Sequence, residues 1–241
     1  MRHLLVINPN TGQATTQRLH SHLQTLLPSD VALDCINARF GAPYIACEAS
    51  HAVASHALLD AWSHHLLTHS SSPDGVIIAC FGDPGLFALR EASAAPVTGL
   101  AEASFIQASR LGAFAIVTGG ARWKPMLERL ALSLDFASQL QHIELVRETG
   151  AQLLADRELA LRILGKACVK AAQKGVNAVI LGGAGLAGYA KDLQSVCPVP
   201  LIDSVSAGLA LYLDNAMPPA SRISNGFEPV WTGLPDHMTV N

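Results

Sequence analysis

Long hydrophobic runs are absent from this sequence, although half of its 241 residues are hydrophobic and its mean hydropathy is +0.30. The apolar stretches are short, such as residues 76–81, whereas a membrane-spanning helix needs about 18 or more apolar residues in succession. The apolar run at residues 4–7 is also too short for the core of a signal peptide. We therefore expect a soluble protein with a large buried core.

Charged residues are also scarce, at 15% of the sequence, and the net charge is only −3. Because no block of Lys and Arg is present, binding to nucleic acid or to another polyanion has no electrostatic basis. The hydrophobic content excludes an intrinsically disordered chain. At about 150 residues per domain, the length fits one large or two small α/β domains.

The five cysteines form no C-x-x-C pair, and their number is odd. A disulfide framework is therefore not indicated, and we expect reduced thiols in the cytoplasm. Most of these cysteines are expected to act as small buried hydrophobic residues.

Short runs rich in β-branched residues alternate with longer amphipathic stretches rich in Ala and Leu. The expected strands lie at residues 4–7, 31–37, 75–79, 97–98, 114–117, 142–146, 178–181 and 201–202. The expected helices lie at residues 15–27, 48–68, 84–91, 123–130, 156–173, 186–195 and 205–213. This alternation predicts an α/β fold with mainly parallel sheets.

The second half of the sequence resembles the first. DGVIIACFG at residues 74–82 is similar to NAVILGGAG at residues 177–185, with Cys80 opposite Gly183. This repeat predicts two pseudo-symmetric Rossmann-like halves, one formed by residues 1–97 plus 206–241 and the other by residues 98–205. We expect the active-site cleft between these halves, at the carboxyl ends of the strands, where open α/β sheets bind ligands.

Four predicted strands end in loops that mix glycine with small polar or reactive residues, at residues 8–12, 80–85, 118–120 and 182–185. Backbone N–H groups in such loops can approach a ligand closely. Cys80 is the candidate reactive group, because we expect Asp83 to cap a helix that has Pro84 as its first residue. The positive end of that helix would favour the Cys80 thiolate and make this cysteine the most reactive of the five.

A different function is indicated by the pattern G-x-G-x-x-G at residues 183–188. Asp203 follows twenty residues after Gly183, as the ribose-binding acid of a dinucleotide site would. This alternative is weakened because the glycines lie late in the chain and because the repeat already accounts for the same loop.

One predicted helix and its end are rich in histidine. The residues are His51, His56, His64, His65 and His69. His65 and His69 are four residues apart and could share a metal ion, but Asp60 is the one carboxylate nearby and no cysteine completes a ligand set. We interpret these histidines as a solvated helix face or an oligomer contact, and we expect no metal site.

The first loops resemble motifs of a known family. INPNT at residues 7–11 resembles the opening motif of the Asp/Glu/hydantoin racemase superfamily. ACFGDPG at residues 79–85 is similar to the first-cysteine motif of its hydantoin and allantoin racemase branch. Residues 99–103, 117–118 and 181–185 follow in the family's order, so the resemblance extends over residues 1–213.

The resemblance implies a cofactor-independent racemase with one cysteine from each half on opposite faces of a hydantoin-like or allantoin-like substrate. One thiolate removes the proton α to a carbonyl, the other thiol returns a proton to the opposite face, and backbone N–H groups hold the enolate oxygen. Carried over, Cys80 is the first acid/base. The implied substrate-binding residues are Asn10, Thr11, Phe81, Gly82, Thr118, Gly119, Ala184 and Gly185. We also expect a homo-oligomer.

The sequence departs from the family at Gly183, which stands where the second cysteine belongs. Glycine cannot transfer a proton, and neither Cys168 nor Cys197 is an obvious substitute. Three functions therefore remain open: a racemase that takes its second proton from water or another group, or is impaired; a one-cysteine carbon-acid enzyme like the arylmalonate decarboxylases; and a catalytically silent binding protein.

Overall fold

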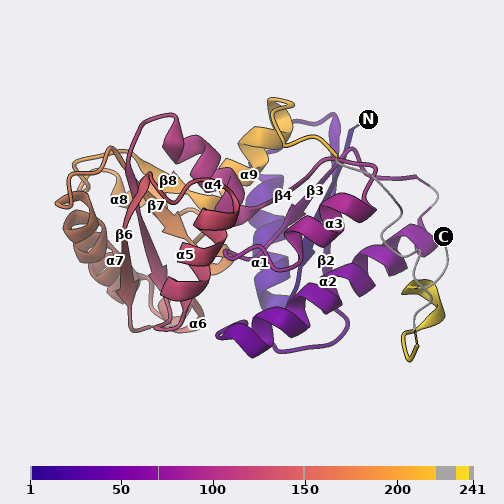
Figure 1. Cartoon of the computed structure of the whole chain (residues 1–241). Coiled ribbons are helices and arrows are strands. Elements are labelled where there is room, and N and C mark those ends of the chain that lie inside the picture. Colours follow the sequence, from indigo (N-terminus) through magenta and orange to yellow (C-terminus); the bar gives the residue numbers. More distant parts are fainter. Residues whose placement is uncertain (1, 70, 149, 221–231, 239–241) are drawn as a thin grey trace. The chain divides into compact units, whose positions relative to one another are not determined.

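The computed structural model describes residues 2–69, 71–148, 150–220 and 232–238. The chain divides into two compact units, each with its own four-stranded parallel sheet (Figure 1). The first unit comprises Met1–Gly99 and Leu211–Asn241, and the second comprises Leu100–Ala210. No helix in the described part of the chain is long and apolar enough to cross a membrane.

The sheet of the first unit has the order β2-β1-β3-β4. Its strands are β1 (Arg2–Asn8), β2 (Val31–Asn37), β3 (Gly75–Ile78) and β4 (Val97–Gly99), all parallel. Its helices are α1 (Gln13–Gln24), α2 (Glu48–Thr68) and α3 (Leu86–Ala92), with the 3-10 helix η2 (Asp236–Met238). Leu4, Leu5 and Ile78 are fully buried because helices cover both faces of a parallel sheet.

The two faces of β2 meet different helices. Cys35 lies with residues of α1, including His20, around one shallow pocket. Asp34, the preceding residue, points to the opposite face, where side chains of α2 approach it. Successive side chains of a strand alternate between faces, so α1 and α2 cover opposite sides of this sheet.

The sheet of the second unit repeats this arrangement, with the order β6-β5-β7-β8. Its strands are β5 (Phe114–Gly119), β6 (Leu140–Val146), β7 (Ala178–Gly182) and β8 (Leu201–Asp203), again all parallel. Its helices are α4 (Leu100–Ser109), α5 (Trp123–Ser133), α6 (Gly150–Ala155), α7 (Arg157–Ala172), the 3-10 helix η1 (Ala184–Leu186) and α8 (Tyr189–Leu193). Helix α9 (Ser204–Leu213) begins in this unit and ends in the part of the chain that belongs to the first unit. The predicted α/β class with two like halves is confirmed.

Three helices differ from the sequence prediction. Helix α4 was not predicted because most of its side chains are buried, which removes the polar face that marks a surface helix. The short helix α6 was also not predicted. The helix expected at residues 186–195 is wrong: η1 and α8 replace it, since Gly188 adopts a left-handed conformation (φ 83°) between them.

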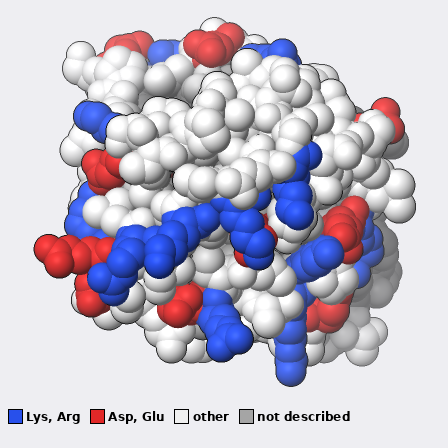
Figure 2. Space-filling view, turned by 90° about the vertical axis from the view of Figure 1, so that its left-hand side faces the viewer, with Lys and Arg blue, Asp and Glu red and all other residues white. Residues whose placement is uncertain are grey.

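Surface charges are mixed on the face of the molecule in Figure 2, where Lys and Arg side chains lie among Asp and Glu side chains. In the second unit, Lys170 Nζ lies 2.7 Å from Glu144 Oε1, and Arg157 pairs with Asp192. This mixture agrees with the low net charge of the sequence.

Candidate active site

Cys80 lies in a tight turn at the carboxyl end of β3. The N–H of Ala79 donates to the carbonyl of Ile7 on β1 at 2.8 Å, which carries the sheet pairing up to this turn. The N–H groups of Gly82 and Asp83 both approach the carbonyl oxygen of Cys80, at 3.0 and 3.1 Å. The backbone of Cys80 is therefore held beside the carboxyl end of β1.

Asp83 is not the helix cap that the sequence suggested. Helix α3 begins at Leu86, and its N-cap is Gly85 in the left-handed conformation (φ 77°), with no side-chain cap. Asp83 itself has a positive φ of 47°, and its side chain is buried against Gly99 at the end of β4. The capping prediction was wrong because the chain makes another turn before the helix starts.

The expectation of a stabilised Cys80 thiolate is contradicted as well. Cys80 is 8% exposed, and burial followed by the nearby charge of Asp83 raises the pKa of its thiol far above the ordinary range. Burial removes the water that would stabilise a thiolate, and a carboxylate repels it. At neutral pH the resting group is thus a thiol that can donate a proton.

The loop at residues 8–12 lies next to the Cys80 turn, because β1 and β3 are adjacent parallel strands. Asn10 is buried, and its side-chain oxygen accepts hydrogen bonds from Gly12 N at 2.8 Å and Asn8 Nδ2 at 3.0 Å. The N–H of Thr11 donates to the carbonyl of Ala42 at 3.1 Å. The side chain of Asn10 therefore stabilises the conformation of this loop.

His51 is a residue of this region that sequence reasoning missed. Its Nε2 lies 2.9 Å from the carbonyl oxygen of Gly82, so the first turns of α2 contact the Cys80 turn. The interpretation of the histidines as one solvated face is wrong for His51, which is partly buried, and for His65, which is buried. Nothing in their spacing distinguishes them, since the contact partners come from distant segments.

The second unit brings its two glycine loops together. Thr118 Oγ1 donates to the carbonyl oxygen of Gly182 at 2.8 Å, which links the ends of β5 and β7. Gly119 is the last residue of β5. Beyond β7, Ala184 and Gly185 form most of the 3-10 helix η1.

Gly183 connects β7 to η1 in a conformation that L residues rarely adopt, with φ at 146°. Its N–H donates to Ser204 Oγ at 3.2 Å, and Ser204 is fully buried. A Cβ atom at this position would have room, with Leu186 Cγ 3.4 Å away. The backbone therefore restricts this position more than the space around it does.

Asp203 has structural partners for both carboxylate oxygens. Oδ1 accepts from the N–H groups of Val205 and Ser206 at 3.0 Å each, and Oδ2 accepts from the N–H of Gly188 at 2.7 Å. These bonds cap helix α9 and hold the glycine loop. These hydrogen bonds explain why an acidic residue lies twenty residues after Gly183, and the explanation does not require a nucleotide ribose as its partner.

Residues 4–212 match the sequence model of the Asp/Glu/Hydantoin racemase family. The chain belongs to this family. It is 32% identical over 206 residues to a hydantoin racemase from Paenarthrobacter aurescens, and the aligned residues cover 85% of this chain and 86% of that protein. A second hydantoin racemase, from a Pseudomonas species, is 32% identical over 208 residues, with 85% and 82% of the two chains covered.

Solved structures give the same racemase fold. The allantoin racemase from Klebsiella pneumoniae superposes with a TM-score of 0.84 at 28% identity, over 98% of this chain and 96% of that one. Arylmalonate decarboxylase superposes with a TM-score of 0.58 at 16% identity, over 90% and 96% of the two chains, which shows a shared fold alone.

In this member of the racemase family, the predicted site residues form two groups. The first unit brings together Asn10, Thr11, Cys80, Phe81 and Gly82 at the ends of β1 and β3. The second unit brings together Thr118, Gly119, Gly183, Ala184 and Gly185 at the ends of β5 and β7. Cys80 and Gly183 thus follow corresponding strands of the two sheets.

Proposed function

We propose that this protein is a cofactor-independent racemase that acts on a hydantoin-like or allantoin-like substrate, with Cys80 as an acid/base. The observation that carries the proposal is the position of Cys80, in a turn at the carboxyl end of β3 beside the buried Asn10 loop. Relatives that are named hydantoin racemases and a structure named allantoin racemase support the substrate class.

In the proposed reaction, the ionised Cys80 sulfur takes the hydrogen on the carbon next to the substrate carbonyl as a proton. The electron pair of that C–H bond moves to the carbonyl oxygen and forms an enolate, which backbone N–H groups of the glycine loops stabilise. Return of the proton from Cys80 restores the starting enantiomer. The raised pKa of Cys80 favours this return step and opposes the first.

Inversion requires a proton on the other face of the enolate, and Gly183 has no side chain to supply it. We propose that water or a nearby hydroxyl supplies this proton. A hydroxyl is a much weaker acid than a thiol, so inversion is expected to be slower than exchange.

Gly183 also favours a second candidate, a one-cysteine carbon-acid enzyme that decarboxylates a malonate and protonates the resulting enolate from the Cys80 face. In that reaction the buried thiol of Cys80 needs only to donate its proton, as its raised pKa suits it to do. A binding protein without catalysis is the remaining alternative.

Single enantiomers of 5-substituted hydantoins, allantoin, aspartate and glutamate, incubated in D₂O and followed by proton NMR and circular dichroism, test the proposal. Deuterium uptake at the reacting carbon with slow inversion supports the racemase. Release of CO₂ from arylmalonates without uptake into hydantoins supports the decarboxylase. Binding without either reaction would identify a binding protein and overturn both enzymatic assignments.

A further inference from the structure

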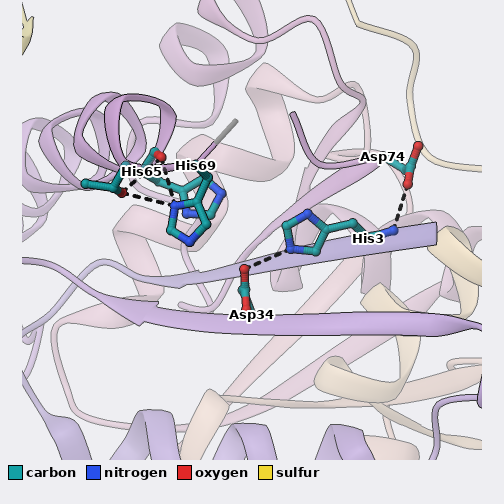
Figure 3. A network of polar contacts seen from close by, with 6 residues as sticks. His3, Asp34, His65, His69 and Asp74 are labelled. Atoms are coloured by element: carbon teal, nitrogen blue, oxygen red, sulfur yellow. Dashed lines mark hydrogen bonds and ion pairs between the residues drawn. The ribbon is translucent and has the colours of Figure 1, made fainter. Parts of the chain in front are cut away.

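Three potential metal ligands converge in the first unit, away from the Cys80 turn. One ligand atom each of Asp34, His65 and His69 lies within 4.8 Å of the other two. Figure 3 shows the imidazole rings of His65, in the last turn of α2, and His69, at the end of that helix, directed toward Asp34 on β2. His3 on β1 lies beside Asp34. Sequence analysis did not connect these residues, because Asp34 lies on a different element from the two histidines.

His65 is the least satisfied group of this cluster. His65 is only 2% exposed, and neither of its ring nitrogens has a hydrogen-bond partner among the described residues. A buried polar group without a partner costs free energy, and in native structures it normally has one. An unprotonated imidazole nitrogen offers a lone pair to a metal ion.

His69 is oriented as metal-binding histidines usually are. Its Nδ1 lies 3.0 Å from the carbonyl oxygen of His65 and 3.0 Å from Thr68 Oγ1. In the tautomer with the proton on Nδ1, this nitrogen donates to the carbonyl and the Nε2 lone pair is available for a metal. Its ring stacks on that of His65 with centroids 4.0 Å apart. His65 lies in the last turn of α2 and His69 is the C-cap of that helix, four residues further on. Histidines at this spacing on a helix are a common pair of ligands for zinc.

Asp34 is held in place by His3. His3 Nε2 lies 2.9 Å from Asp34 Oδ2, and the backbone N–H of His3 donates to Asp74 Oδ2 at 2.7 Å. A hydrogen-bonded partner that fixes a ligating carboxylate is typical of metal sites. His3 is thus a positioning residue for the carboxylate.

We propose that Asp34, His65 and His69 form a binding site for a divalent cation of the zinc type. Zinc takes nitrogen and carboxylate ligands at about 2.0–2.2 Å, which requires ligand atoms roughly 3.3 Å apart in a tetrahedron. Binding would require side-chain rotations that close the present spacing to that value, with water completing the coordination. This departs from the sequence expectation that these histidines hold no metal.

The site is too far from Cys80 to act on the substrate. His65 lies about four turns beyond His51 along α2, about 21 Å at 1.5 Å per residue. His51 is the residue whose Nε2 lies 2.9 Å from the carbonyl oxygen of Gly82 in the Cys80 turn. The ion would instead tie the last turn of α2 to β2 and stabilise the first unit. The proposal therefore does not rest on the proposed racemase activity.

Isothermal titration calorimetry of the full-length, EDTA-treated protein with zinc chloride tests the site. We expect one ion per chain, with affinity at least about 100-fold weaker in Asp34→Asn and in His69→Gln. At zinc concentrations 100 times Kd, the melting temperature of the unsubstituted protein should rise by about 5–10 °C. The matched control is His64→Gln, which removes an exposed histidine from the same helix.

Wild-type affinity in Asp34→Asn or His69→Gln would overturn the proposal, as would loss of binding in His64→Gln or absence of binding in the original protein. These conservative variants avoid truncating the buried His65, and circular dichroism of the metal-free proteins shows whether they fold. Because binding is measured directly, a negative result leaves the assignment of Cys80 untouched, and an inactive protein leaves the zinc result interpretable.

Discussion

The buried carboxyl group of Asp83 fills the space in which a Cβ atom on Gly99 would lie. Gly99 ends β4, and Asp83 follows Cys80 in the turn after β3, where its N–H approaches the carbonyl of Cys80 at 3.1 Å. The absence of a side chain at Gly99 therefore lets the Cys80 turn settle against the neighbouring strand.

Gly99→Ala should consequently destabilise the first unit and displace the Cys80 turn. We expect the free energy of unfolding to fall by about 1–3 kcal/mol, as for other overpacked sites, with a loss of proton exchange in substrates. Urea denaturation and NMR exchange measure both. The control is Gly165→Ala in α7, where the nearest side-chain atom is 3.3 Å from the added Cβ and helix propensity favours Ala. Unchanged stability in Gly99→Ala would contradict the close packing.

Cys80→Ser should lower the rate of proton exchange by about 10²–10⁴-fold, because a hydroxyl is a far weaker acid than a thiol. Cys47→Ser, at a half-buried cysteine before α2, should leave that rate unchanged. The measurement is deuterium uptake by a single hydantoin enantiomer. Full activity in Cys80→Ser would remove Cys80 from the mechanism.

Iodoacetamide should modify Cys47 before Cys80 at about pH 8. Cys80 is buried, and its pKa is raised by burial and Asp83, so both access and thiolate content oppose its alkylation. Peptide mass spectrometry over time gives the order of modification. Preferential labelling of Cys80 would mean that its turn opens and that the thiolate is more stable than its surroundings indicate.

Stability should decline above about pH 8.5, where thiols of the unfolded chain lose their protons. Burial raises the pKa of Cys168 to about 12 and that of Cys80 further, so the folded state holds protons that the unfolded state releases. Stability that is present below that pH is thus lost as pH rises, by up to about 1.4 kcal/mol per pH unit for each thiol. Urea denaturation between about pH 9 and pH 11 should give a shallower decline in Cys168→Ala; an identical slope would refute this linkage.

Gly183→Cys should increase inversion relative to exchange if the second acid/base acts from this position, as the family resemblance implies. The same change should lower stability by about 1–3 kcal/mol, because φ at Gly183 is 146°. Gly183→Ala is the matched control, with the same backbone strain and no thiol. Circular dichroism of a pure hydantoin enantiomer measures inversion, and equal rates in the two variants would exclude a role for the new thiol.

The sequence alone determined the α/β class and the two-fold repeat, because alternating strand and helix periods and turn residues are local properties. It also located the loops that carry Cys80 and Gly183, since these follow directly from the ends of buried strands. Helix α4 escaped prediction because its burial on most sides leaves no periodic polar face.

Only the tertiary structure decided the protonation of Cys80 and the environment of the histidines. The removal of water by burial raises the thiol pKa, and the charge of Asp83 raises it further. The charge lies only three residues from Cys80 in the sequence, but the burial cannot be read from the spacing of residues 80–85. His51 and His65 lie on one helix, yet they meet Gly82 and Asp34, which other elements supply. Such contacts depend on how distant segments pack. The free energy of burying a thiol or an imidazole, and of placing it beside a charged group, is therefore set by the tertiary structure.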